Sequence, residues 1–542
     1  MRFSWHILIL FSLIFSACHQ YEIDQSKQIF RYNISEGVSS LDPAFARSLE
    51  NVSTVGHLFN GLVQMDEELN IQACIAKSWK VLDSGLRYQF VLRNDVYFHD
   101  SPVFVSREEQ RVKAKDFVYS LNRLVDQKLL SPGKWVMNSV RRTESGTLDI
   151  VAVNDSVLEI KLQHPFPPFL GILSMAYCSV VPEKVILKNE NDFRAHPIGT
   201  GPFKFKYWKE GSKLVLLKND NYFEKDTEGN YLPYLDALAI SFTKDEEVSF
   251  LKFLKGEMDY LSGLKGSYKD ELLDATGQLN SKYKSKIKLV KSPYLNTEYL
   301  GFLLNSDSTN IVSNKWIRKA INFGFDRKKM LKYLRNNMGT PAEQGFIPKG
   351  LPSYDSSQKG YQFNADSVYY YLAKAGYMKG NLIPTITLST TAQYIDLCEY
   401  IQHQLKAFGF DIQIEVNQAA TNNEMIAFGK KDFFRKSWVA DYPDAENYLS
   451  LFYSKNFSPN GPNYTHFQSK QYDSLYEAAM KLPDLAQRKG LYRKMNQLII
   501  DEAPVVPLFY DEVVRFIPPS ISGVGVNPMN ILVLKHARKA LN

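Results

Sequence analysis

A strand–helix–strand pattern between residues 385 and 416 is the feature that most limits the fold of this chain. Thr385–Ser389 is rich in β-branched residues, Ile395–Phe408 carries apolar residues at helical spacing, and Gly409 follows the helix. Asp411–Val416 then alternates between polar and apolar side chains. Two strands joined by a helix form a parallel pair with a right-handed crossover. The later part of the chain is therefore predicted to be an α/β lobe.

The earlier part of the chain shows a different periodicity. Apolar residues alternate with polar ones at Leu86, Tyr88, Phe90 and Leu92. The same holds at Leu158, Ile160 and Leu162, and this pattern is typical of half-buried antiparallel strands. At 542 residues the chain is also too long for one hydrophobic core. We therefore expect a mixed α/β and α+β protein of two or three domains.

Several further elements are expected from local patterns. Apolar spacing predicts helices over Val55–Val63 and Lys315–Leu334, and Asp484 caps a last long helix that Pro504 ends. Val505–Phe516 then returns as a strand.

The N-terminus has the features of an export signal. Arg2 is followed by a short apolar run, Ile7–Phe15, that is too short to span a bilayer. Two small residues then precede Cys18, which resembles the lipobox of bacterial lipoproteins. That resemblance implies a signal peptide over residues 1–17, lipidation of Cys18 and a tether over residues 18–28. The alternative is an ordinary signal peptide in which Cys18 is incidental.

Charge and cysteine content narrow the functional classes. The net charge of +7 is small for this length and no block of Lys or Arg occurs, so nucleic-acid binding is not expected. Beyond Cys18 the chain has Cys74, Cys178 and Cys398 without a CxxC spacing. We expect buried free thiols rather than a zinc or redox site.

Motifs for catalysis are missing from the sequence. There is no G-x-S-x-G elbow and no HExxH, and the nine histidines are far apart. We therefore expect neither a metal nor a cofactor, and a binding protein is favoured over an enzyme. Asp441 and Asp444 remain open as the two carboxylates of a glycosidase.

The stretch from Lys436 to Asp444 is the strongest candidate for ligand contact. Trp438 and Tyr442 offer flat amphipathic surfaces, and Asp441 stands where Pro443 should end the extended chain. A carboxylate at a strand end can pair with a ligand cation. Taken alone, the same residues are more typical of a solvated turn acid beside a core tryptophan.

Nearly the whole mature chain resembles the extracellular solute-binding proteins of the peptide/nickel class, the receptors of peptide ABC importers. The matching segments follow the family's order: Ser40-Leu41-Asp42-Pro43, Leu58-Phe59-Asn60-Gly61-Leu62, Ala114 to Leu121, Pro197 to Phe203, Asn221-Tyr222-Phe223, Arg318 to Ile321, Ala373 to Tyr377, and Glu502-Ala503-Pro504.

The resemblance implies a fold of the periplasmic-binding-protein type II kind. Two α/β lobes would be joined by two hinge strands near residues 289–293 and 504–509, and the ligand would be captured between them. Lobe I would comprise residues 29–66, 190–288 and 509–542. An extra domain would occupy residues 67–189, and lobe II residues 289–508.

The resemblance also implies roles for particular residues. An extended peptide would be held by Ser437-Trp438-Val439 on one lobe and by Arg47-Ser48-Leu49 on the other, as an added strand is. Asp441 matches an aspartate that pairs with the peptide α-ammonium group. Arg435 more loosely matches an arginine that meets the C-terminal carboxylate of short peptides. Tyr442 is a further candidate contact, and Ser437 departs from the family, where glycine is common.

The expected function is that of a monomeric, lipid-anchored receptor in the cell envelope, facing the periplasm or the exterior. It would capture peptides and deliver them to an ABC permease. Alternatives within the class are a nickel chelate, haem, an opine or an oligosaccharide as ligand. A carboxylate-dependent hydrolase and an envelope chaperone or sensor are alternatives outside it.

Overall fold

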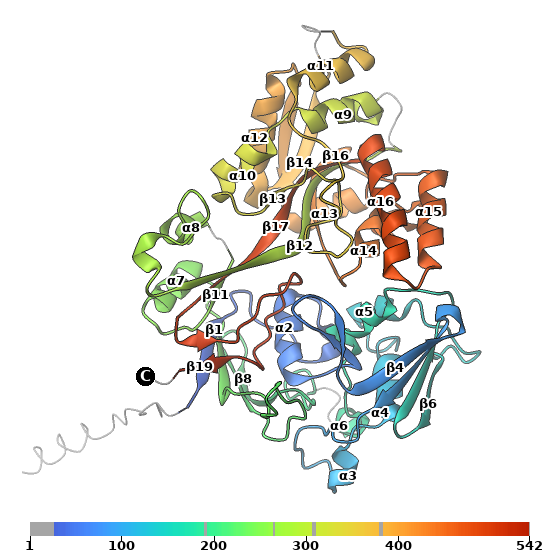
Figure 1. Cartoon of the computed structure of the whole chain (residues 1–542), viewed down its shortest axis with the longest axis vertical. Helices are drawn as coiled ribbons and strands as arrows, with labels where there is room; N and C mark the ends of the chain where they lie inside the picture. Colours follow the sequence, from blue (N-terminus) through green and yellow to red (C-terminus); the bar gives the residue numbers. More distant parts are fainter. Residues whose placement is uncertain (1–26, 189–191, 264–265, 306–309, 379–382, 541–542) are drawn as a thin grey trace, which may run out of the picture.

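The computed structural model describes residues 27–188, 192–263, 266–305, 310–378 and 383–540. The export signal and Cys18 expected from the sequence lie outside these residues. Helices and strands form an upper and a lower part joined by two long strands (Figure 1). The architecture is mixed α/β, as predicted.

The first lobe is built on a four-stranded sheet. Its order is β1-β10-β9-β8, with β1 parallel to β10 and the other pairs antiparallel. The strands are β1 (Ile29–Asn33), β8 (Phe203–Lys209), β9 (Lys213–Lys218) and β10 (Ala237–Ser241). Phe30 and Tyr32 point into the core from alternate positions of β1. The C-terminal segment returns to this lobe, since Ile521 and Leu534 join the same hydrophobic cluster.

A second antiparallel sheet lies beside the first lobe. Its order is β4-β5-β7-β6, from β4 (Ala76–Leu82), β5 (Arg87–Leu92), β6 (Ile150–Asn154) and β7 (Val157–Lys161). The predicted alternation is confirmed for Tyr88, Phe90 and Leu92 of β5, which are buried while their neighbours are half-exposed. It is wrong for Leu86, which precedes the strand and is exposed. Phe90 and Phe117 belong to the same cluster as Phe30, so this extra region shares its core with the first lobe.

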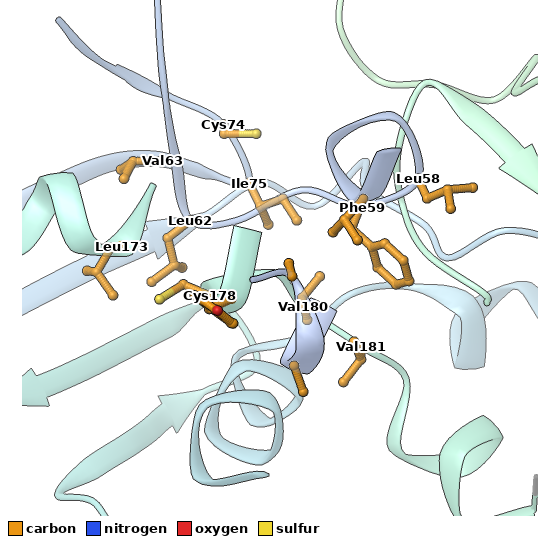
Figure 2. Packing of buried hydrophobic residues seen from close by; sticks show 14 of the residues in the cluster. Leu58, Phe59, Leu62, Val63, Cys74, Ile75, Leu173, Cys178, Val180 and Val181 are labelled. Carbon is orange, nitrogen blue, oxygen red and sulfur yellow. The ribbon is translucent and has the colours of Figure 1, made fainter. Parts of the chain in front are cut away.

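The shared core continues beneath the surface that faces the other lobe. Figure 2 shows residues of one buried cluster that come from separate segments: Leu58 at the end of α2 (Leu49–Leu58), Phe59, Val63 of the hairpin strand β2 (Val63–Met65), and the segment from Leu173 to Val181. The partner strand of the hairpin is β3 (Ile71–Ala73). Cys74 and Cys178 lie in this cluster as buried free thiols, and Cys398 is buried in the second lobe. The prediction that these three cysteines are buried free thiols is confirmed.

The second lobe contains the predicted strand–helix–strand unit. β14 (Ile386–Thr391) and β15 (Ile412–Asn417) pair in parallel, and α12 (Ile395–Lys406) connects them. The sheet order is β11-β17-β12-β16-β14-β15, with β13 on β17. The remaining strands are β11 (Leu261–Ser262), β12 (Lys288–Phe302), β13 (Thr340–Pro341), β16 (Phe433–Val439) and β17 (Val505–Ile517), while β18 (Ile521–Ser522) and β19 (Arg538–Lys539) form a separate pair.

Strands β12 and β17 connect the two lobes as an antiparallel pair (Figure 1). Their ladder is interrupted between Pro293 and Thr297, opposite residues 510–512 of β17. Leu289 and Phe516 pack at one end with the small cluster around α7 (Glu246–Leu254) and α8 (Gly266–Leu272). Leu300 at the other end packs in the core of the second lobe. The domain boundaries and hinge positions expected from the sequence stay predictions.

Two helices differ from the expectation. α2 covers Leu49–Leu58, not Val55–Val63, because the Ser48 hydroxyl accepts the N–H of Asn51 and caps the helix there. The expected helix over Lys315–Leu334 is two helices, α9 (Lys315–Phe323) and α10 (Arg327–Arg335), because Gly324 ends the first and the Asp326 side chain caps the second. The apolar spacing continues across this break.

The other helices follow the chain in order: α3 (Arg107–Gln110), α4 (Ala114–Arg123), α5 (Phe169–Leu173), α6 (Glu183–Lys188), α7 (Glu246–Leu254), α8 (Gly266–Leu272), α11 (Ala365–Lys374), α13 (Ala419–Ala427), α14 (Glu446–Leu449), α15 (Lys470–Met480) and α16 (Leu485–Glu502). Asp484 caps α16, as predicted. Within the described part of the chain, none of the helices has the length and apolar character that crossing a membrane requires.

Candidate functional site

A cavity of about 760 Å³ opens between the two lobes. Its wall comes from the start of α2, the hairpin β2–β3, the segment before Ser179, the hinge strand β12, the end of β16 and the C-terminal segment. The lining residues are Ala46, Arg47, Leu49, Val52, Gly56, Phe59, Asn60, Gly61, Val63, Gln64, Met65, Cys74, Pro132, Trp135, Ser174, Met175, Ala176, Tyr177, Ser179, Tyr294, Val439, Ala440, Asp441, Met529 and Ile531. Most of these side chains are apolar or aromatic, as is usual for ligand pockets.

The end of β16 presents a free backbone edge beside this cavity. The N–H of Ala440 donates to the carbonyl of Leu295 on β12 at 2.9 Å. In an antiparallel pair, the backbone N–H and C=O groups of successive residues point alternately toward the partner strand and away from it. The backbone groups of Ser437 and Val439 therefore point away from β12. On that side β14 pairs only with the first two residues of β16. Among the described residues, no strand therefore pairs with β16 at Ser437 and Val439.

Asp441 follows this free edge directly. Asn447 holds it in place, because its oxygen accepts the backbone N–H of Asp441 at 3.1 Å and its amide donates to the carboxylate at 3.4 Å. Solvent reaches the carboxylate, yet the surrounding protein desolvates it and raises its pKa, an effect that the Asn447 amide partly offsets. The described residues provide no cation within ion-pair distance of Asp441.

Trp438 packs on the lobe side of the strand and not in the cavity. Its ring is half-buried against the hydrophobic cluster around Tyr448, and its indole N–H donates to the Asn447 oxygen at 2.9 Å. Of the predicted strand Ser437 to Val439, only Val439 lines the cavity.

Tyr442 forms a contact between the lobes. Its ring is buried in the core cluster of the first lobe, edge-on to Phe166, and it lies against Gly171 of α5. Its hydroxyl donates to the carboxylate of Glu446, which also accepts the hydroxyl of Tyr476. Tyr442 is not among the cavity-lining residues.

Arg435 lies outside the cavity and is already paired. Its guanidinium forms a buried ion pair with Glu298 and sits over the Tyr394 ring, 3.0 Å from the ring centre. Burial raises the pKa of Glu298, an effect that the neighbouring Arg435 opposes. In this arrangement Arg435 is not available to a ligand carboxylate.

The first-lobe segment lies across the cavity from Asp441. Arg47 and Leu49 both line the cavity. The strand expected at Arg47-Ser48-Leu49 is not formed, because Ser48 caps α2 and Leu49 is its first residue. Only Arg47 and Ser48 precede the helix.

Several cavity residues carry no recognisable signal in the sequence. Trp135, Tyr177, Tyr294 and Met529 come from four separate parts of the chain and reach the cavity through the fold. Asn447 is the exception, since an amide six residues after Asp441 and at the start of α14 is a plausible partner for a strand end. This residue was not predicted.

Two lobes, two connecting strands and a cavity between the lobes define a ligand-capturing protein of the hinge-closing class. The family model described as "Bacterial extracellular solute-binding proteins, family 5 Middle" matches residues 70–460. The chain belongs to this family, the peptide- and nickel-class receptors of ABC importers, which bind peptides or related ligands.

Individual relatives are similar along their whole length. The periplasmic murein peptide-binding protein MppA of Escherichia coli is 26% identical over 92% of this chain and 91% of its own. The structure of HbpA2 from Haemophilus parasuis aligns with a TM-score of 0.81 at 20% identity, covering 94% of this chain and 99% of that one. NikZ from Campylobacter jejuni, solved in complex with Ni(L-His), aligns with a TM-score of 0.71 at 21% identity, covering 92% and 96%.

Proposed function

We propose that this protein is a lipid-anchored receptor that captures peptides in extended form and delivers them to an ABC permease. The observation that carries the proposal is the free backbone edge of β16, which reaches the interlobe cavity and ends at Asp441. An added strand binds through main-chain groups and is indifferent to side chains. The Asp441 carboxylate would then pair with the peptide α-ammonium group and set where the ligand begins.

The raised pKa of Asp441 agrees with a carboxylate that awaits a cation in a desolvated cleft. Removing such a partner from a closed cleft costs roughly 3–5 kcal/mol of binding free energy. Val439 and Ser437 would supply the backbone contacts on the second lobe, and Arg47, Ser48 and Leu49 would face the ligand from the first lobe. Trp438 and Tyr442 would not contact the ligand. Trp438 would hold Asn447 through its indole N–H, and Tyr442 would hold the two lobes in contact.

Catalysis is not part of the proposal. Asp444, the second carboxylate of the hydrolase alternative, pairs with Arg488 at 3.1 Å and accepts the hydroxyl of Tyr492 at 2.8 Å. A carboxylate held by two side chains is poorly placed to activate water. The relatives matched above are binding proteins as well.

Thermal-shift measurements with peptide pools and their N-acetylated counterparts test the proposal. A ligand that binds only the folded state raises its stability by RT ln(1 + [L]/Kd), so free-amine pools should raise the melting temperature more than acetylated pools. Asp441→Asn should remove this difference. The matched control is Asp432→Asn, an exposed carboxylate just before the same strand.

Equal shifts from free and acetylated pools would refute the role of Asp441. If nickel–histidine, haem, an opine or an oligosaccharide raises the melting temperature more than any peptide does, the ligand belongs to that class and is not a peptide. If the protein cleaves labelled peptides or glycans and Asp441→Asn abolishes the cleavage, the receptor function is refuted and the protein is a hydrolase.

The anchor is tested separately. If Cys18 is lipidated, the protein expressed from its full sequence fractionates with membranes, and Cys18→Ser releases it, because stable anchoring depends on the acyl chains. An unchanged distribution of Cys18→Ser would refute lipidation. The protein is expected to elute as a monomer in either form.

A further inference from the structure

The interlobe cavity contains a second charge that faces Asp441. Of the described residues that line it, Arg47 and Asp441 are the two with fully charged side chains. They come from opposite lobes, Arg47 from the segment before α2 and Asp441 from the end of β16. The surrounding wall is apolar, aromatic or uncharged, for example at Trp135, Met175 and Ile531.

Arg47 is free to take a partner. Its side chain is exposed in the cavity, and no hydrogen bond, ion pair or ring contact engages the guanidinium among the described residues. Arg435, the other arginine near this site, is committed to Glu298 and does not reach the cavity. Arg47 is therefore the cation that a ligand in the cavity meets.

Tyr177 shows that the two charges act on one region. It lines the same cavity, and its pKa is raised first by burial; the positive charge of Arg47 lowers it and the negative charge of Asp441 raises it. One hydroxyl thus lies within the field of both groups. The cavity that both residues line has a volume of about 760 Å³, which is in the range of sites for small ligands. A ligand of a few residues can therefore contact both charges.

Closure of the lobes makes pairing of Arg47 necessary. An arginine that loses water without gaining a partner costs several kcal/mol in a site of low dielectric constant. A carboxylate can satisfy the guanidinium with two parallel hydrogen bonds. A ligand that pairs only with Asp441 leaves Arg47 uncompensated when the cleft closes.

We propose that Arg47 is the carboxylate-binding residue of the cleft, so that the protein selects short peptides carrying a carboxylate close to their α-ammonium group. This inference rests on the proposed function, because it assumes that Asp441 binds the ammonium end. The carboxylate has two possible sources: the C-terminus of a di- to tetrapeptide, or an acidic side chain at the start of a longer one.

Calorimetric titration with defined pools tests the inference. The pools are di-, tri- and tetrapeptides with free C-termini, the same pools with amidated C-termini, and amidated pools that begin with Glu. In the unmodified protein the free acids should bind roughly tenfold to hundredfold more tightly than the amides. If an acidic side chain is the source, the amidated Glu pools bind as tightly as the free acids.

Three variants decide the role of the arginine. Arg47→Gln should bring free acids and amides to nearly equal affinity, Arg47→Lys should keep part of the preference, and Arg47→Glu should reverse it. Arg107→Gln is the matched control, because Arg107 is exposed in the extra region beside the first lobe and lines a different cavity. It should leave the preference unchanged.

The possible outcomes separate the two proposals. If the unmodified protein prefers free amines over acetylated peptides but Arg47→Gln keeps the full preference for free acids, the role of Arg47 is refuted and the receptor function stands. If N-acetylation has no effect on binding, the proposed function fails and this inference fails with it. Equal binding of the free acids, the amides and the amidated Glu pools by the unmodified protein also refutes the inference.

Discussion

The side chain of Asn447 holds Asp441 from two sides, accepting its backbone N–H at 3.1 Å and donating to its carboxylate at 3.4 Å. The same Asn447 oxygen accepts the indole N–H of Trp438. A buried amide on α14 thus orients the strand end whose carboxylate is proposed to meet the ligand. This relationship makes Asn447 a positioning residue for Asp441.

Asn447→Ala should therefore weaken both binding and stability. The indole N–H of Trp438 would lose its partner while half-buried, which should lower the free energy of unfolding by about 1–3 kcal/mol. Peptide affinity should fall roughly tenfold, because Asp441 loses its fixed orientation. Trp438→Phe, which removes the indole N–H and leaves Asn447 on Asp441, serves as the comparison in denaturant titration and calorimetry. Full peptide affinity in Asn447→Ala would contradict the positioning role.

The buried pair of Arg435 and Glu298 should dominate the stability of the second lobe near the hinge. Arg435→Met leaves the Glu298 carboxylate buried and unpaired, so we expect the free energy of unfolding to fall by roughly 3–5 kcal/mol. Replacing both residues by Met should restore much of this loss. Lys455→Met, which breaks the exposed pair with Glu477, should change stability little. Urea unfolding measures all three, and a small effect of Arg435→Met alone would show that the pair is not essential.

Glu446 predicts a pH dependence of stability. Desolvation raises the pKa of this buried carboxyl from its ordinary value of 4.5 to about 7, although the hydroxyls of Tyr442 and Tyr476 favour its ionised form. Between these two values the unfolded chain ionises while the folded protein keeps the proton. The free energy of unfolding should therefore fall as pH rises, by up to about 1.4 kcal/mol per pH unit, and level off above about pH 7.

Glu446→Gln tests this assignment, because the amide keeps an acceptor for the two tyrosines and cannot ionise. The variant should flatten the pH dependence of unfolding across the window between pH 4.5 and 7. Asp432→Asn, at an exposed position before β16, should leave the slope as it is. An unchanged slope in Glu446→Gln would assign the dependence to other groups.

Gly171 should be sensitive to side-chain size because it faces the other lobe. A Cβ added there would lie 3.5 Å from the Cβ of Tyr442 and 3.6 Å from Pro443, which is ordinary contact. Gly171→Ala should therefore be tolerated and should stabilise α5 slightly. Gly171→Gln should hold the lobes apart and weaken ligand binding with little loss of stability. Small-angle scattering and calorimetry on both variants check this, and equal affinities would show that the contact does not limit closure.

Local pattern predicted much of the second lobe. The parallel unit of β14, α12 and β15 and the Asp484 cap of α16 were visible as periodicity and as capping residues. The predicted bounds of two helices were wrong, because local capping residues set the observed ends. At α2 and at the α9–α10 break, Ser48, Gly324 and Asp326 outweigh an apolar spacing that continues past them.

Only part of the candidate site could be predicted from the sequence. Asp441 could be singled out because a carboxylate, two aromatic residues and a proline stand together in nine residues, and the order of the matching segments identified the family. The ion pair of Arg435 could not be predicted from the sequence, because its partner Glu298 is 137 residues away. Arg47 looked like one residue of a backbone strand until α2 was seen to begin at Leu49.

The sequence alone determined the family, the α/β character of the second lobe and the strand end that carries Asp441, because periodicity, caps and motif order are local properties. The tertiary structure alone decided which charges face the cavity. Arg47 and Asp441 are almost 400 positions apart, and only the arrangement of two lobes on two long strands places both of them in the lining of one cavity. Whether a side chain is buried or paired depends on such distant neighbours. The tertiary structure therefore decides that Arg435 is paired with Glu298 while Arg47 is exposed in the cavity.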